Sequence, residues 1–125
     1  MTRTTDEVID RFNGAFRERD ATLLEDIIAP DCVMESVQPA PDGSRYEGYG
    51  ASFSSWEALI DDTTSHFEVK DVHAGEWALI RWRYVWGPRP DGSVRGVNVM
   101  RVVDGKIVEA AGYSKTAPIA AALES

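Results

Sequence analysis

The side chain best suited to chemistry is the amide of Asn98, which stands alone among Val97, Val99 and Met100. An amide in so apolar a stretch must find a hydrogen-bond partner or face a cavity, because burying an unpaired amide is costly. In a cavity, its NH2 group can donate to a carbonyl or enolate oxygen of a ligand. The alternative is an amide satisfied by a buried backbone group or by water.

A proton-transfer reaction would need a second group near Asn98. Glu35 could act as a general base, since desolvation near aromatic side chains would raise its pKa. Strand alternation instead favours an outward Glu35, solvated or ion-paired, and an inward side chain requires a one-residue slip of register. The hydroxyl of Ser36 is the other group that could handle a proton, and the Tyr84 hydroxyl could assist Asn98.

The remaining reactive side chains predict no metal site and no disulfide. His66 and His73 lie at the ends of one expected strand without a third ligand. One of them could act as an acid or base at the rim of a pocket. Cys32 is the only cysteine, and its apolar neighbours indicate a buried thiol. No cofactor is implied.

The hydrophobic periodicity outlines the elements that must position these residues. It predicts helices at about residues 4–19, 21–28 and 52–62, with Thr4 and Glu7 at capping-box spacing and Asp20 as the second cap. A period of two predicts strands at about residues 32–38, 66–73, 77–86, 94–103 and 106–115. Helices followed by a run of strands are typical of the α+β class, and we expect one domain over residues 1–125.

The register of the last two strands decides which side chains share a face with Asn98. A two-residue turn at Asp104-Gly105 would pair Asn98 with Ala111, whereas a bulged turn would pair it with Ala110. The bulged register is favoured, because it gathers small side chains around Asn98 on one surface.

The bulk composition excludes some partners. The chain has 21 acidic and 13 basic residues and a net charge of −8, which argues against nucleic acid and against anionic membranes. No segment reads as a membrane span or a signal peptide, so we expect a cytoplasmic protein.

Four segments carry a resemblance to a known superfamily. They are residues 8–20, Ala29-Pro30-Asp31-Cys32-Val33-Met34-Glu35, Arg45-Tyr46-Glu47-Gly48, and Arg95-Gly96-Val97-Asn98-Val99 with Asp104-Gly105-Lys106-Ile107. In this order they resemble the nuclear transport factor 2-like (NTF2-like) superfamily, which includes ketosteroid isomerases, SnoaL-like polyketide cyclases and limonene epoxide hydrolases. The resemblance implies a cone-shaped α+β domain, with three N-terminal helices packed on a strongly curved, mostly antiparallel sheet around a deep apolar pocket.

The resemblance also locates positions of catalytic groups. The general base of the isomerases falls at Ser36, next to Glu35, and their tyrosine donor falls at Phe12. The protonated acid of their oxyanion hole falls at Asn98, which alone keeps a hydrogen-bond donor. The arginine and two aspartates of the epoxide hydrolases would fall at Trp82, Tyr84 and Gly112, so that activity is not expected.

The sequence therefore predicts a pocket for a small hydrophobic molecule such as a polyketide, a steroid-like compound or a terpenoid. The function would be an isomerase or cyclase acting on a carbonyl compound without a cofactor, with Asn98, Tyr84, Ser36 and Glu35 as candidate catalytic residues. The alternative is a non-catalytic ligand-binding or dimeric interaction module. The predicted ligand-binding residues are Phe12, Phe16, Met34, Phe53, Trp56, Trp82, Trp86, Met100, Ala110, Gly112 and Ser114.

The outer face of the sheet is expected to be apolar. Val97, Val99, Ile107 and Ala111 would lie on it together. Such a face predicts a homodimer, which the superfamily commonly forms through its sheet.

Overall fold

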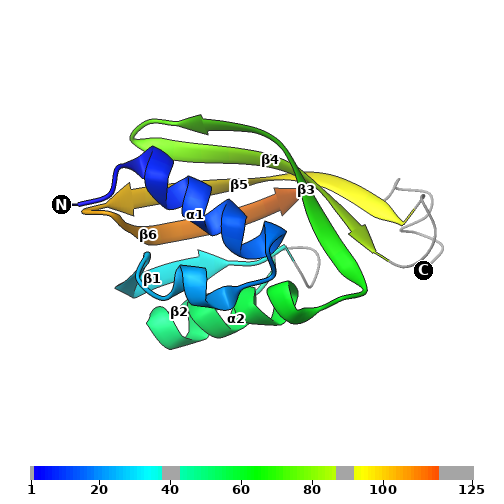
Figure 1. Ribbon diagram of the computed structural model, residues 1–125, viewed down its shortest axis with the longest axis horizontal. Coiled ribbons are helices and arrows are strands. Elements are labelled where there is room, and N and C mark those ends of the chain that lie inside the picture. The colour runs from blue at the N-terminus through cyan, green and yellow to red at the C-terminus, as the bar shows by residue number, and fades with distance from the viewer. Residues whose placement is uncertain (1, 38–42, 87–91, 116–125) are drawn as a thin grey trace.

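A six-stranded mixed sheet with two α-helices forms the fold of this chain (Figure 1). The computed structural model describes residues 2–37, 43–86 and 92–115. The elements, in chain order, are α1 (Thr5–Arg17), the short 3-10 helix η1 (Ala21–Leu24), β1 (Ile28–Glu35), β2 (Arg45–Glu47), α2 (Tyr49–Asp61), β3 (Ser65–Ala74), β4 (Trp77–Trp86), β5 (Ser93–Val103) and β6 (Lys106–Ser114).

The strands follow the order β2-β1-β6-β5-β4-β3, and only the β1–β6 pair is parallel. Figure 1 shows α1 lying across one face of the sheet and α2 beside the β1–β2 edge. The α+β class and the mostly antiparallel sheet are confirmed. The sheet is not strongly curled, so the strongly curved cone that the resemblance implied is corrected to a more open sheet.

Two α-helices, not three, cover the sheet. The predicted capping box of α1 is confirmed, because the Thr4 side chain accepts from the backbone N–H of Glu7 and the Glu7 side chain accepts from that of Thr4. The predicted second helix shortens to η1, where the Asp20 carboxylate accepts from the backbone N–H of Thr22 at 3.1 Å. The chain is already extended at Ile28. Neighbouring apolar residues near a helix end fit a strand as well as a helical stripe, so spacing alone could not separate them.

The edge of the sheet also differs from the prediction. β1 begins at Ile28, earlier than expected, because Ile28 pairs with Ile107 of β6. Pro30 is exposed within β1, where the β1–β6 register shifts, and such irregular positions tolerate a proline in a strand. The three-residue strand β2 was not predicted. Helix α2 starts at Tyr49, after Gly48 with a φ of 94°.

The β5–β6 hairpin combines a two-residue turn with a bulge. Asp104 and Gly105 have φ angles of 52° and 75°, and Val103 pairs directly with Lys106. Positive φ at both central residues is typical of a type I′ turn, whose twist matches the twist of the two strands in a hairpin. Farther along, the register shifts and Val108 is the extra residue on β6.

This combination places Gly112 opposite Asn98, so both predicted partners, Ala110 and Ala111, are wrong. Beyond the bulge, the favoured register nevertheless grouped the faces correctly, because the true register there differs from it by an even number of residues. The residues on the face with Asn98 are Gly96, Met100, Ala110, Gly112 and Ser114.

The bulge corrects the predicted outer face as well. Ile107 is fully buried in the core, so it does not lie with Val97 and Val99 on the outer surface. The core lies between the helices and the inner face of the sheet, which is the face opposite to Val97 and Val99. It contains the thiol of Cys32, as predicted, and burial raises the pKa of that thiol.

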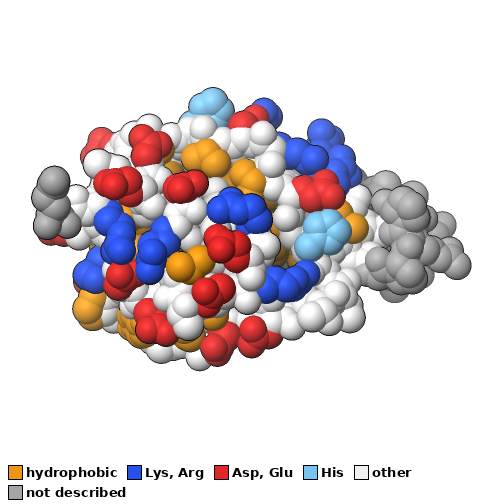
Figure 2. Space-filling model, in the orientation of Figure 1, with side chains coloured by type: hydrophobic (Ala, Val, Ile, Leu, Met, Phe, Trp, Pro, Cys, Tyr) orange, Lys and Arg blue, Asp and Glu red, His pale blue; other side chains and the backbone are white. Residues whose placement is uncertain are grey.

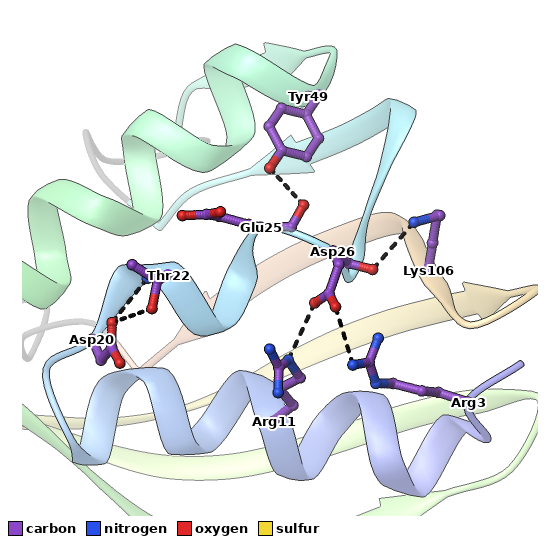
Figure 3. Close-up of polar contacts among 8 residues, drawn as sticks. All are labelled: Arg3, Arg11, Asp20, Thr22, Glu25, Asp26, Tyr49 and Lys106. Atoms are coloured by element: carbon purple, nitrogen blue, oxygen red, sulfur yellow. Dashed lines mark hydrogen bonds and ion pairs between the residues drawn. The ribbon is translucent and has the colours of Figure 1, made fainter.

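The exposed residue Asp26 connects separate elements of the N-terminal half through hydrogen bonds (Figure 3). Asp26 accepts hydrogen bonds from Arg3 at 3.1 Å and from Arg11 of α1 at 3.2 Å. The Lys106 ammonium donates to the backbone carbonyl of Asp26 at 3.1 Å. The segment after η1 is thereby joined to α1 and to the hairpin. No helix within the described ranges is long and apolar enough to cross a membrane.

Candidate functional site

A cavity of about 1160 Å³ lies between α1, α2 and the inner face of the sheet. Its inner wall comes from buried side chains such as Phe12, Trp56 and Met100. Of the fifteen residues predicted for the site, all but Phe53 line this cavity. Phe53 instead stacks on Tyr49, one turn earlier on α2, with ring centroids 5.9 Å apart. The structure thus corrects that position.

Aromatic rings form a continuous wall of the cavity. Phe67 is central to it, because its ring lies 5.5 Å from that of Phe16, 5.2 Å from that of Trp82 and 4.6 Å from that of Tyr84. Trp86 extends the wall beyond Tyr84 at 5.7 Å. Phe67 was missed in the sequence, although it alternates with exposed residues on its strand. Such a wall suits a flat, apolar ligand.

Asn98 and Trp82 form the polar centre of the cavity. The indole N–H of Trp82 donates to Oδ1 of Asn98 at 3.1 Å. The two residues lie diagonally on neighbouring strands, since Trp82 pairs with Gly96 and Asn98 with Ile80. The carbonyl oxygen of the Asn98 amide therefore has a side chain as its partner.

Two glycines make room for this pair. A Cβ at Gly96 would lie 2.3 Å from Cη2 of Trp82 and 2.5 Å from the backbone oxygen of Tyr113. A Cβ at Gly112 would lie 3.1 Å from Oδ1 of Asn98. The indole can cross β5 closely only because position 96 has no side chain.

The indole contact also fixes the direction of the amide. Because Oδ1 of Asn98 accepts from a donor-only group, the NH2 group must be on the other side of the amide. In the part of the chain that the structure describes, this NH2 group has no acceptor, and Asn98 lines the cavity. A ligand oxygen would supply the missing acceptor.

The hydroxyl groups of the site differ in their surroundings. The Ser36 hydroxyl accepts from the backbone N–H of Ser44 at 3.2 Å. The Tyr84 ring belongs to the aromatic wall, and Ser114 ends β6 at the cavity. These groups add polar positions to a lining that is mainly apolar.

Glu35 lies at the edge of the cavity but its carboxylate is ion-paired. It accepts from Arg45 Nη1 at 3.4 Å, and its side chain is 46% exposed. Its neighbour Met34 is buried against the cavity, so strand alternation directs Glu35 to the other face. The inward slip of register needed for a general base is absent.

Basic residues that the sequence analysis did not assign to the ligand-binding set line the exposed part of the cavity, its mouth. Arg17, Arg19 and Lys115 line it together with His66, whose Nε2 lies 3.2 Å from Oε2 of Glu68. These residues come from separate elements, so only the fold brings them together. Nothing in their spacing along the chain predicts it.

Arg19 holds this end of the cavity in place. Its guanidinium donates to the backbone oxygens of Ile60, Asp62 and Ser65 at 2.6–2.9 Å. Arg19 itself has a φ of 51°, a left-handed conformation that is uncommon for a residue with a side chain. It therefore joins the end of α1 to the end of α2 and the start of β3.

Within residues 2–37, 43–86 and 92–115, no group of three or more His, Cys, Asp or Glu side chains is placed to hold a metal ion.

An α+β fold with a six-stranded mixed sheet and an apolar cavity beneath α1 places the chain in the NTF2-like class. The chain belongs to the SnoaL-like domain family, whose model matches residues 9–110. The resemblance seen in the sequence is thus confirmed.

Solved structures agree with this assignment. An NTF2-like protein of unknown function from Mesorhizobium loti is 46% identical, with a TM-score of 0.81 and coverage of 90% of this chain and 91% of that one. A candidate polyketide cyclase from Sinorhizobium meliloti is 23% identical, with a TM-score of 0.68 and coverage of 85% and 93%. A steroid delta-isomerase from Pseudomonas aeruginosa is 18% identical, with a TM-score of 0.74 and coverage of 90% and 80%. Among curated proteins, no sequence matches the chain.

Proposed function

We propose that this protein binds a flat, hydrophobic carbonyl compound in the cavity, with the carbonyl oxygen accepting from the NH2 group of Asn98. The observation that carries the proposal is the hydrogen bond from the Trp82 indole, which directs the amide donor away from Oδ1. A fixed donor costs no reorganisation when the ligand binds, and it polarises the carbonyl.

The size and lining of the cavity support ligands with fused rings. Its volume of about 1160 Å³ is large enough for a small organic ligand with several rings, and aromatic side chains form much of its wall. The matches to a steroid delta-isomerase and a candidate polyketide cyclase, at 18% and 23% identity, show only the fold. The ligand class therefore rests on the shape and chemistry of this cavity.

The first experiment is a thermal-shift screen with steroids, aromatic polyketides, terpenoids and acetylnaphthalene. We expect a rise in melting temperature with at least one ketone, because a ligand that binds only the folded state stabilises it. No shift with any member of the panel would contradict the proposal.

The second experiment tests Asn98 directly. Asn98→Asp keeps an acceptor for the Trp82 indole but removes the NH2 donor. We expect calorimetry to show about fivefold weaker binding of the ketone, since a lost hydrogen bond costs about 1 kcal/mol. Binding of the matched hydrocarbon, ethylnaphthalene for acetylnaphthalene, should change little. Equal losses for both ligands would contradict a carbonyl contact.

A second candidate function is catalytic, an isomerase or cyclase in which a base removes a proton next to the polarised carbonyl. The observation that favours it is that His66 borders the same cavity as Asn98, at the start of β3, where strand alternation places it on the face opposite to Phe67. The ring nitrogens of an imidazole can accept and donate a proton. The Ser36 hydroxyl and the phenol of Tyr84 could relay or stabilise charge in the same space.

Proton exchange separates the two candidates. If the protein is catalytic, NMR in deuterated water should show the protein accelerating exchange of the ketone's α-protons, and His66→Gln should abolish it. Unchanged exchange in His66→Gln would contradict His66 as the base. A bound ketone without accelerated exchange would leave ligand binding as the function.

We also propose that two copies of the chain associate through the outer face of the sheet. Trp77, Leu79 and Tyr113 are 45%, 41% and 58% exposed there. They lie beside Val97 and Val99 on the central strands β4, β5 and β6. So many large apolar groups on one face of a sheet are typical of an interface.

A further inference from the structure

We infer that the ligand of this cavity carries an anionic group, most simply a carboxylate, which binds at the mouth to Arg17 and Lys115. This inference rests on the proposed function, because it adds a charged end to the hydrophobic molecule that the cavity would hold. It goes beyond the carbonyl contact at Asn98, which concerns the inner part of the same site.

The charges that line the cavity are opposite in sign to those of the whole chain. The chain has 21 acidic and 13 basic residues, yet the cavity is lined by Arg17, Arg19 and Lys115 against one carboxylate, Glu35. Glu35 is moreover ion-paired with Arg45, at 3.4 Å. Figure 2 shows acidic and basic side chains interspersed over one face of the molecule, so a basic bias is not general to that surface. Clefts lined by one sign of charge attract ligands of the other sign.

Three elements contribute the basic residues that line the cavity. Arg17 ends α1, His66 lies at the start of β3, and Lys115 follows β6. Figure 1 shows α1 and β6 running toward the same half of the molecule, where β3 begins. The hydrogen bonds from Arg19 to backbone oxygens hold the end of α1 against the start of β3. The arrangement is thus built into the fold.

Two of these cations are available to a ligand. In the described part of the chain, the Lys115 ammonium has no carboxylate within ion-pair distance. Arg17 has only a loose pair, 3.8 Å from Glu18, and both side chains are largely exposed. Arg19 is different, because its guanidinium already donates to three carbonyls.

The burial of the cavity wall indicates where the anion would sit. The inner wall is apolar, and an unpaired carboxylate placed there would lose its hydration. At the mouth, the Arg17 and Lys115 side chains are exposed, so the carboxylate can keep part of its water while it pairs with them. The ligand would therefore be an amphiphilic acid, with its rings inside and its carboxylate at the mouth.

The experiment compares 2-naphthoate, its methyl ester and acetylnaphthalene by calorimetry and Trp fluorescence at low and high salt. The first expectation is tighter binding of naphthoate than of the ester, with a difference that shrinks in high salt. The second is that the double variant Arg17→Gln/Lys115→Gln weakens naphthoate binding about tenfold, as loss of two exposed charge contacts implies. Binding of the ester should stay within about twofold, within the range of substitutions away from a contact.

Arg101→Gln with Lys70→Gln is the matched control. Both residues are exposed, on β5 and β3, and do not line the cavity, so this variant removes one arginine and one lysine elsewhere. Naphthoate binding that falls equally in control and test would overturn the assigned contacts, because only the net charge would then matter. Ester or ketone bound as tightly as the acid would overturn the inference and leave the proposed function intact. Binding of none of the three, together with a negative ligand screen, would overturn the proposed function itself.

Discussion

At the residue scale, one amide is fixed by a contact that the sequence could not show. Asn98 was recognised because a polar side chain interrupts an apolar strand. Its partner Trp82 is sixteen residues away, and the contact depends on the pairing of β4 with β5. Alternation placed both residues on the cavity side, but their diagonal contact requires the register. The direction of the amide donor therefore came only from the fold.

The first prediction concerns Gly96→Ala. The new Cβ would lie within 2.5 Å of the Trp82 ring and of a backbone oxygen, so the indole must move and its hydrogen bond to Asn98 must break. We expect a loss of about 2 kcal/mol in the free energy of unfolding, as overpacking typically costs. Urea unfolding followed by Trp fluorescence measures it, and ketone binding should weaken in parallel.

Gly50→Ala is the control for this prediction. Gly50 lies in α2, and a Cβ there would meet nothing within 4 Å. Because alanine favours a helix over glycine, we expect a gain of about 0.5–1 kcal/mol. If Gly96→Ala unfolds at the same urea concentration as the natural protein, the close approach of Trp82 to β5 is not required.

At the element scale, periodicity located most strands but not the ends of the elements. The predicted strand over residues 77–86 coincides with β4, because a run of alternating aromatic residues admits one interpretation. The predicted helix over residues 21–28 failed where the same apolar side chains serve the start of β1. β2 has three residues, too few for a recognisable pattern. Elements that depend on tertiary pairing were thus the ones that the sequence missed.

The second prediction concerns Asp26, which links the segment after η1 to α1. Burial alone would raise the pKa of Asp26, but the hydrogen bond from Arg3 and the positive charges of Arg11 and Arg3 outweigh it and lower that pKa. A carboxyl whose pKa is lower in the folded state stabilises the fold above its unfolded pKa of about 3.9. That contribution is lost as the pH falls through the folded pKa.

We therefore expect Asp26→Asn to destabilise the protein at pH 7 by at most about 1 kcal/mol, since the carboxylate is half exposed and screened by solvent. The difference should shrink as the pH falls through the lowered pKa of the folded state, where the natural carboxyl becomes protonated as well. Unfolding curves at pH 7, 5 and 3 measure it. A difference that grows as the pH falls would contradict the pairing with Arg3 and Arg11.

At the scale of the whole molecule, the class of fold was predictable and the cavity mouth was not. Element order and the Asp104-Gly105 turn identified the superfamily, because they depend on local residues. The basic mouth depends on Arg17, His66 and Lys115, which line one cavity from distant elements, and no local pattern encodes this. The outer face of the sheet was predictable only in part. Its alternation was visible, but the bulge at Val108 moved Ile107 into the core.

The last prediction concerns association through that outer face. Trp77 and Tyr113 are large, exposed and on central strands, and a stable interface of about 1,200–2,000 Å² would need to cover them. Light scattering should give twice the chain mass of 13.8 kDa for the natural protein. The double variant Trp77→Glu/Tyr113→Glu should give a folded monomer, because four buried charges of one sign would meet across a two-fold axis.

Val72→Glu is the control, since Val72 is exposed but pairs with buried Ile80, on the side of the sheet opposite to Trp77. It should leave the dimer intact. A natural protein that is monomeric at tens of micromolar would show that this face serves another purpose.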